Sequence, residues 1–184
     1  IRRQHNNKLR HDRINKRGAG MKTYNITPVP TNYKGYAFRS RLEARWAVYF
    51  DKIGIEWDYE TDAYLLPNGE YYLIDFDIPE FGHVEIKALG QVTEEEKEKC
   101  RLLSELLKTE VALFEGSPDT KAYVCFSKGI ECPAICFSHY TVRKWNQTPA
   151  YTGGEHLDDS SYVDEETKEA ISYAKKYRFE RLKK

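Results

Sequence analysis

Apolar residues follow two kinds of spacing along this chain. From Ser40 to Ile53 they recur at helical spacing on one stripe, which predicts a helix that Gly54 ends. A second helix is predicted from Thr93 to Lys108, where Thr93-x-x-Glu96 has the spacing of a capping box. The residues of the first stripe, which we expect in the core, are Leu42, Trp46, Tyr49, Phe50 and Ile53.

Short apolar or alternating runs between and after these helices predict strands. The segment before the first helix, 27–36, is expected to be a loop and a turn. With a last helix over 164–184, the order α-β-β-β-α-β-β plus a C-terminal helix predicts an α/β fold with a central mixed β-sheet flanked by helices. The five strands are expected at Ile55–Glu60, Tyr72–Ile74, Val84–Lys87, Val111–Phe114 and Ala122–Phe126.

Changes in composition suggest the domain boundaries. We place one core domain at 21–144, a polar Gly-, Asp- and Ser-rich loop at 145–163, and the C-terminal helix at 164–184. The first 20 residues are rich in Lys and Arg and precede Met21, the single methionine. We interpret residues 1–20 as sequence upstream of the native start or derived from an expression vector. The alternative is a basic arm that contacts phosphates.

Composition limits the classes of function. Lys and Arg together number 29, as do Asp and Glu, so any nucleic-acid surface must be a local patch. We find no apolar run that could span a bilayer and no signal peptide. The four cysteines lack disulfide-framework spacing, so we expect a cytoplasmic protein. Cys132, Cys136 and His139, with Cys125 as a fourth ligand, could bind zinc, but buried strand residues are the preferred interpretation.

Three residues suited to a metal site lie on a predicted hairpin. Asp75 ends one strand, and Glu85 and Lys87 lie two positions apart on the next, so that their side chains share one face. Carboxylate oxygens are the ligands that Mg²⁺ requires. A lysine beside them can orient a water or stabilise charge that develops on a phosphate. The hairpin therefore predicts a site for a hard divalent cation.

An Asp followed after about ten residues by Glu-x-Lys on a hairpin resembles the PD-(D/E)XK nuclease superfamily. Upstream, Phe38-Arg39-Ser40-x-x-Glu43-x-x-Trp46 is similar to the first core helix of small phage-encoded endonucleases of that superfamily and of related transposon end-cleaving nucleases. The resemblance extends from about Tyr33 to Phe126 and implies a restriction-endonuclease-like core. One departure is Ile74, which stands where the motif usually has proline.

The resemblance implies a Mg²⁺- or Mn²⁺-dependent deoxyribonuclease, an endonuclease of phage or mobile-element origin that cuts DNA in a bacterial host. Glu43, Asp75 and Glu85 would bind the metal with the main-chain carbonyl of Ile86, and Lys87 would position the attacking water. Cutting both strands of a duplex would favour a homodimer. The alternatives are a non-catalytic nucleic-acid-binding module with a nuclease-like fold and an interaction protein whose acids are surface charges.

The role of Glu43 and the contacts to DNA each have two interpretations. Glu43 lies on the rim of the first helix's buried stripe, where it could reach a metal, or it could form a surface ion pair with Arg39. His83 could touch substrate or be a solvent-exposed turn residue. The basic end of the last helix could follow a DNA backbone or simply suit the helix dipole. The candidate nucleic-acid contacts are Arg39, Ser40, Arg41, His83, Lys175, Lys176 and Arg178.

Overall fold

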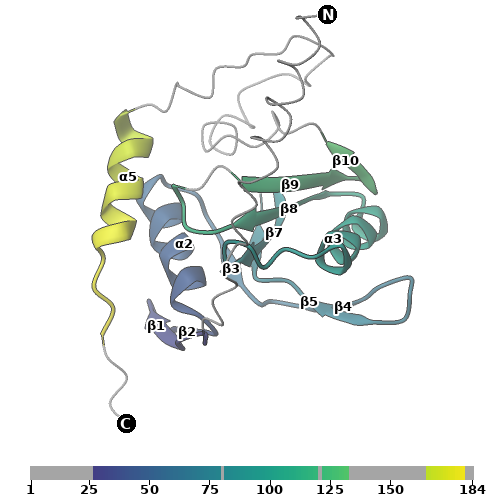
Figure 1. Cartoon of the computed structure of the whole chain (residues 1–184), viewed down its shortest axis with the longest axis horizontal. Coiled ribbons are helices and arrows are strands. Elements are labelled where there is room, and N and C mark those ends of the chain that lie inside the picture. The colour runs from purple at the N-terminus through teal and green to yellow at the C-terminus, as the bar shows by residue number, and fades with distance from the viewer. Residues whose placement is uncertain (1–26, 80, 120–121, 133–164, 181–184) are drawn as a thin grey trace, which may run out of the picture.

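A computed structural model of the chain describes residues 27–79, 81–119, 122–132 and 165–180. At its centre is a six-stranded mixed β-sheet with strand order β10-β9-β8-β7-β6-β3 (Figure 1). Within this sheet β7 and β8 pair in parallel, and the other neighbours are antiparallel. The strands are β3 (Asp58–Tyr59), β6 (Phe76–Ile78), β7 (Gly82–Lys87), β8 (Glu110–Glu115), β9 (Ala122–Ser127) and β10 (Ile130–Cys132).

Other elements cover both faces of this sheet, which confirms the predicted mixed sheet flanked by helices. One face packs against helix α2, and α5 packs on the outer side of α2 (Figure 1). The opposite face packs against α3 and the small sheet of β4 and β5. The sheet is thus buried between two apolar cores. These elements are α2 (Arg41–Lys52), α3 (Glu94–Leu107), α5 (Glu165–Lys176), β4 (Ala63–Leu65) and β5 (Tyr71–Leu73).

Helix α2 buries most of the stripe predicted from its spacing. Trp46 and Phe50 are at most 2% exposed and pack against aromatic rings of the sheet. The Trp46 indole N–H also donates to the carbonyl of Gly116 at 2.9 Å. Ser40 is the N-cap and forms a complete capping box with Glu43, which satisfies free N–H groups at the helix start. Packing and capping together fix the end of α2 that lies nearest the predicted site.

Helix α3 forms almost where it was predicted. The Thr93 side chain accepts the Glu96 N–H, and Lys108 ends the helix in the left-handed conformation at φ 57°. Cys100 and Leu103 are fully buried on the face toward the sheet. The Glu96 carboxylate lies 3.1 Å from the ammonium of Lys87, so its side chain is turned toward the sheet. One acid of α3 is therefore part of the polar network described below.

The turn predicted before α2 is confirmed at Lys34 and Gly35, but the segment is more ordered than the predicted loop, because strands flank this turn. This segment forms a hairpin of β1 (Thr31–Tyr33) and β2 (Tyr36–Phe38), whose turn residues have positive φ. The aromatic rings of β2 pack against Trp57, which adds tertiary contacts that a local reading of the sequence does not include. The strand expected over 55–60 is limited to β3, and β10 is an additional edge strand.

The hairpin predicted for the candidate site pairs differently from expectation. Strand β7 pairs with β6, with Phe76 opposite Val84, and not with the segment 72–74. The Asn68-Gly69 turn folds β5 back on β4, so that the backbone of 71–73 is used in the small sheet. Asp75 therefore precedes the partner strand of β7. It lies at the bend where the chain passes from the small sheet to the central sheet.

Some predictions concern residues outside the described ranges. They include the arm 1–20, the loop 145–163, and the zinc candidates Cys136 and His139. Helix α5 ends at Lys176, and 177–180 are not helical, so the helix predicted to 184 was too long. No helix in the described part of the chain is long and apolar enough to cross a membrane.

Candidate active site

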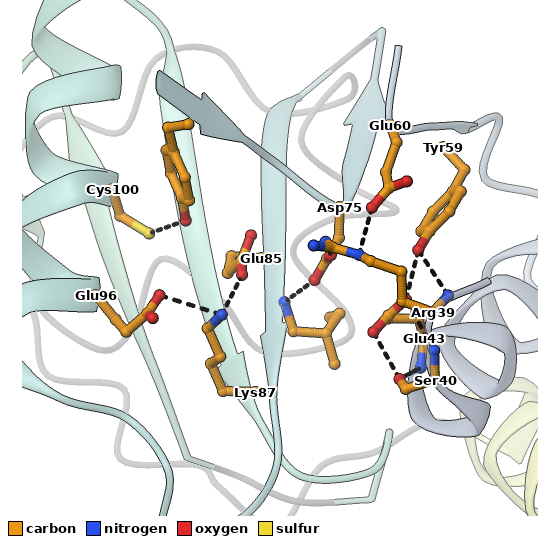
Figure 2. Close-up of polar contacts among 12 residues, drawn as sticks. Arg39, Ser40, Glu43, Tyr59, Glu60, Asp75, Glu85, Lys87, Glu96 and Cys100 are labelled. Carbon is orange, nitrogen blue, oxygen red and sulfur yellow. Dashed lines mark hydrogen bonds and ion pairs between the residues drawn. The ribbon is translucent and has the colours of Figure 1, made fainter. Parts of the chain in front are cut away.

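Asp75 is the most deeply buried carboxylate among the predicted site residues, with 1% of its surface exposed. Its Oδ2 accepts the main-chain N–H of Ile86 at 2.7 Å, which places it beside Glu85 on β7 (Figure 2). Its Oδ1 accepts from the Arg39 guanidinium at 2.6 Å. Both oxygens of Asp75 are therefore engaged, one by the sheet and one by a cation.

Glu85 and Lys87 lie on the face of β7 that is turned toward α3, as their alternation predicted. The Lys87 ammonium lies 2.6 Å from Glu85 Oε1 and 3.1 Å from Glu96 on α3 (Figure 2). Glu85 is 2% exposed, and its Oε2 has no hydrogen-bond partner among the described residues. A buried carboxylate oxygen without a donor is costly. Among the oxygens of Glu43, Asp75 and Glu85, it is the one that lacks a donor in the described part of the chain.

Glu43 comes from the first turn of α2 and binds neutral groups. Its Oε1 accepts the Ser40 hydroxyl at 2.6 Å, and its Oε2 accepts the Tyr59 hydroxyl at 2.5 Å. The Ser40 N–H adds a longer bond of 3.3 Å to Oε2. The alternative of a surface pair with Arg39 is wrong, because Glu43 is 8% exposed and Arg39 pairs with other acids.

Arg39 precedes the N-cap of α2, and its side chain contacts Glu60 and Asp75. Its Nη2 contacts Asp75, and its Nε lies 2.5 Å from Glu60, which follows β3 (Figure 2). Its main-chain N–H donates to the Tyr59 hydroxyl at 3.1 Å. Its side chain nevertheless remains 53% exposed. Arg39 is therefore held at the solvent side of the carboxylates.

Burial raises the pKa of two of these acids. Burial raises the pKa of Asp75 well above its ordinary value, and the nearby carboxylates of Glu85 and Glu43 raise it further, while the Ile86 N–H and Arg39 oppose the shift. Burial also raises the pKa of Glu85, and Lys87 opposes that rise. Both groups thus carry their negative charge at a cost that a bound cation would relieve.

Lys87 has the opposite balance. Burial alone would lower its pKa, but the charges of Glu85 and Glu96 and their hydrogen bonds outweigh burial and raise it. Lys87 is therefore an ammonium at neutral pH. It can donate hydrogen bonds or stabilise negative charge, but it is not available as a proton acceptor.

The donor set fits a hard cation, but its present arrangement does not complete a metal site. Asp75 and Glu43 belong to one network through Arg39 and Tyr59, and Glu85 belongs to a second with Lys87 and Glu96. All three are carboxylates, the kind of ligand that Mg²⁺ prefers. Within the described ranges, however, no three His, Cys, Asp or Glu side chains converge closely enough to hold an ion. Arg39 also binds one oxygen of Asp75, and Ser40 and Tyr59 bind Glu43, so these ligand oxygens are already engaged. The part assigned to the Ile86 carbonyl stays a prediction.

The remaining candidate DNA contacts are dispersed. His83 is buried at the start of β7, with its ring packed edge-on to Tyr64 at 5.4 Å, so the alternative of an exposed turn histidine is wrong. It lines an open pocket with Asp77, at the opposite end of β7 from Lys87. Arg41 is exposed in the first turn of α2. Lys175 pairs with Asp119. Helix α5, which ends with Lys175 and Lys176, lies across α2 from the sheet, and Arg178 follows this helix.

Three residues of the network were missed by sequence reasoning. Tyr59 and Glu60 connect α2 to Asp75 through Glu43 and Arg39, and Glu96 shares Lys87 with Glu85. Tyr59 and Glu60 ended a predicted strand, and Glu96 was assigned only to a capping box. A polar side chain at a strand end next to a buried acid was the available signal.

Comparisons with known proteins add no family to this description. A scan against protein-family models and searches of curated proteins and of solved structures found no match for the chain. The assignment of function therefore depends on the residues and their geometry.

Proposed function

We propose that this protein is a metal-dependent deoxyribonuclease that hydrolyses phosphodiester bonds of DNA with Mg²⁺ or Mn²⁺, as an endonuclease of phage or mobile-element origin. The observation that supports the proposal is the burial of Asp75 beside Glu85, with Lys87 on the same face of β7. A stable core does not need two adjacent buried acids, because unpaired buried charge is destabilising. A cation ligand role explains why both are there.

Each residue would contribute in a way that its contacts allow. Asp75, Glu85 and Glu43 would hold the ion through oxygen, and the Glu85 Oε2 is the position already without a donor. Lys87 would donate a hydrogen bond to the attacking water or to the phosphate, because its raised pKa keeps it protonated. The bound ion would supply charge stabilisation for the phosphate and the leaving oxygen. DNA is the partner, and a homodimer would let the protein cut both strands.

The test is cleavage of plasmid and linear DNA by purified protein with Mn²⁺. Asp75→Asn should reduce cleavage by a factor of about 10³ or more while DNA binding persists, because the change removes a ligand charge with little change of shape. Lys87→Ala should slow cleavage strongly and leave Mn²⁺ binding in place. The matched control is Asp58→Asn, which makes the same substitution at an exposed carboxylate of β3 that bonds to Tyr36. Cleavage by Asp75→Asn at the wild-type rate would exclude this site.

A further inference from the structure

Two cations touch the predicted metal ligands, and they are held differently. Lys87 bridges Glu85 and Glu96, and its side chain is 27% exposed. Arg39 bridges Asp75 and Glu60, and its side chain is 53% exposed. Arg39 is thus the cation that can leave its carboxylate without opening the core.

Arg39 also occupies a position that a metal ion would need. Asp75 has two oxygens, and the main chain of β7 already binds Oδ2 through the N–H of Ile86. Arg39 binds Oδ1, the oxygen of Asp75 that does not accept the Ile86 N–H. A metal ion that binds Asp75 through Oδ1 would therefore meet the guanidinium at 2.6 Å from the same atom. Two positive charges at the same oxygen repel each other, so metal binding through Oδ1 would weaken the contact with Arg39.

The surrounding structure provides a place for Arg39 when it is away from Asp75. Glu60 adopts a φ of 48°, which residues other than glycine rarely do, and its N–H donates to the Asp75 carbonyl at 3.0 Å. The hydrogen bond to Asp75 stabilises this backbone conformation. In it, the Glu60 carboxylate contacts the Nε of Arg39. On release from Asp75, Arg39 would keep its ion pair with Glu60. It would lose one of two ion pairs, and its backbone would remain fixed by Tyr59.

We propose that Arg39 is an internal counter-cation that neutralises Asp75 in the metal-free protein and competes with the metal ion for that carboxylate. The proposal rests on the proposed function, because it assigns Asp75 as a ligand. It makes Arg39 a positioning residue of the metal site. Metal binding and the Arg39–Asp75 ion pair are then mutually exclusive, so removal of Arg39 must strengthen metal binding.

The experiment is calorimetric titration of Mn²⁺ alone, without DNA, into the full chain. Arg39→Ala should bind Mn²⁺ about five- to tenfold more tightly than the wild type. This is the gain expected when a half-exposed, charged side chain no longer competes with the ion for Asp75. Asp75→Asn should weaken Mn²⁺ binding. In the Asp75→Asn background, Arg39→Ala should bring no gain, because the two residues act through the same contact. Arg101→Ala is the matched control, since Arg101 also contacts two carboxylates, Glu98 and Glu105, but on the surface of α3.

Thermal unfolding gives a second readout that a purely structural role would not produce. Without metal, Arg39→Ala should unfold at a lower temperature than the wild type, because Asp75 loses its counter-charge. With saturating Mn²⁺ the difference should shrink or reverse, because the ion replaces Arg39. Arg39→Gln, which keeps hydrogen-bond donors without charge, should behave in the same way.

The possible failures are distinct. If the wild type binds Mn²⁺ through Asp75 but Arg39→Ala binds it equally or more weakly, the competition is refuted while the proposed function stands. An equal loss of thermal stability with and without Mn²⁺ would also refute it. If neither the wild type nor Arg39→Ala binds Mn²⁺, both proposals fail together.

Discussion

At the scale of single residues, each acid of the site is bound by a different kind of donor. Asp75 binds a guanidinium and a main-chain amide, Glu85 binds an ammonium, and Glu43 binds hydroxyl groups. These donors offset the burial of the acids only in part, because the pKa values of Asp75 and Glu85 stay raised. The metal-free protein therefore pairs its buried acids incompletely, and its stability should depend on pH in an unusual direction.

The free energy of unfolding should fall as pH rises when metal is removed by chelation. The ordinary pKa values of the two carboxyls are 3.8 and 4.5, and both are higher in the folded protein. Above these ordinary values the unfolded chain has released protons that the folded chain still holds, so a rise in pH favours unfolding. The contribution of Asp75 and Glu85 is full below that range and is lost as pH rises toward the raised pKa values. Urea unfolding between pH 4.5 and 7.5 measures it.

Glu85→Gln isolates this effect from that of other titrating groups. The variant lacks one of the two carboxyls, so its unfolding free energy should fall less steeply over the same pH range. The Lys87 ammonium keeps Glu96 as a partner in this variant. Saturating Mn²⁺ should also flatten the wild-type profile. Parallel profiles for the wild type and Glu85→Gln would show that Glu85 does not titrate as the contacts require.

At the scale of elements, the periodicity of the sequence identified most features within single helices and strands but few of the pairings between strands. The α2 stripe, the α3 boundaries and the alternation that places Glu85 and Lys87 on one face were predictable, because each depends on spacing within one element. The partner of β7 was not, because the apolar run 71–74 suits either the small sheet or the central one. The hairpin before α2 was missed because contacts to Trp57, distant in sequence, stabilise it.

The same distinction holds for the candidate site. Glu43 and Asp75 are linked through Tyr59 and Arg39, and Glu85 and Lys87 form an ion pair on the neighbouring strand, although the roles of these residues remain predictions. Arg39's link to Asp75 joins positions far apart in the sequence, and no spacing rule connects them. Such contacts depend on how the elements are placed relative to each other.

Glu43 has a role in α2 that must be separated from metal binding, and Glu43→Gln does so. Glutamine at this position still serves a capping box with Ser40 but has only one oxygen to accept the two hydroxyl groups, so the free energy of unfolding should fall by about 1 kcal/mol. If Glu43 is a ligand, the loss of charge should weaken Mn²⁺ binding, depress cleavage and reduce the thermal stabilisation by Mn²⁺. Full activity with an unchanged Mn²⁺ shift would assign Glu43 to capping alone.

At the scale of the whole molecule, the segment after α5, near the end of the described chain, packs against β1, near its beginning. Tyr177 and Phe179 pack edge-on against Tyr33 of β1, with ring centroids 5.3 and 6.2 Å apart from it. Fully buried Ala170 and Ala174 let α5 approach α2 closely. This arrangement covers the hairpin β1–β2, which immediately precedes Arg39.

Removal of the two rings should loosen that hairpin. Tyr177→Ser combined with Phe179→Ser should lower the free energy of unfolding by about 1–3 kcal/mol, because two partly buried aromatic contacts are lost. The amides of β1 and β2 should exchange hydrogen faster, while those of β7 and β8 stay protected. Glu180→Ser is the control, since Glu180 is exposed in the same segment. Unchanged exchange in β1 and β2 would show that the hairpin is ordered without the two rings.

The position of these rings also has a consequence for the order of events during synthesis. A two-stranded hairpin is marginal on its own, so β1–β2 gains its order from partners elsewhere. Some of those partners, Tyr177 and Phe179, are among the last described residues that the ribosome adds. The first hairpin would then gain these contacts only once residues 177–179 have been synthesised, and so would the backbone that leads to Arg39.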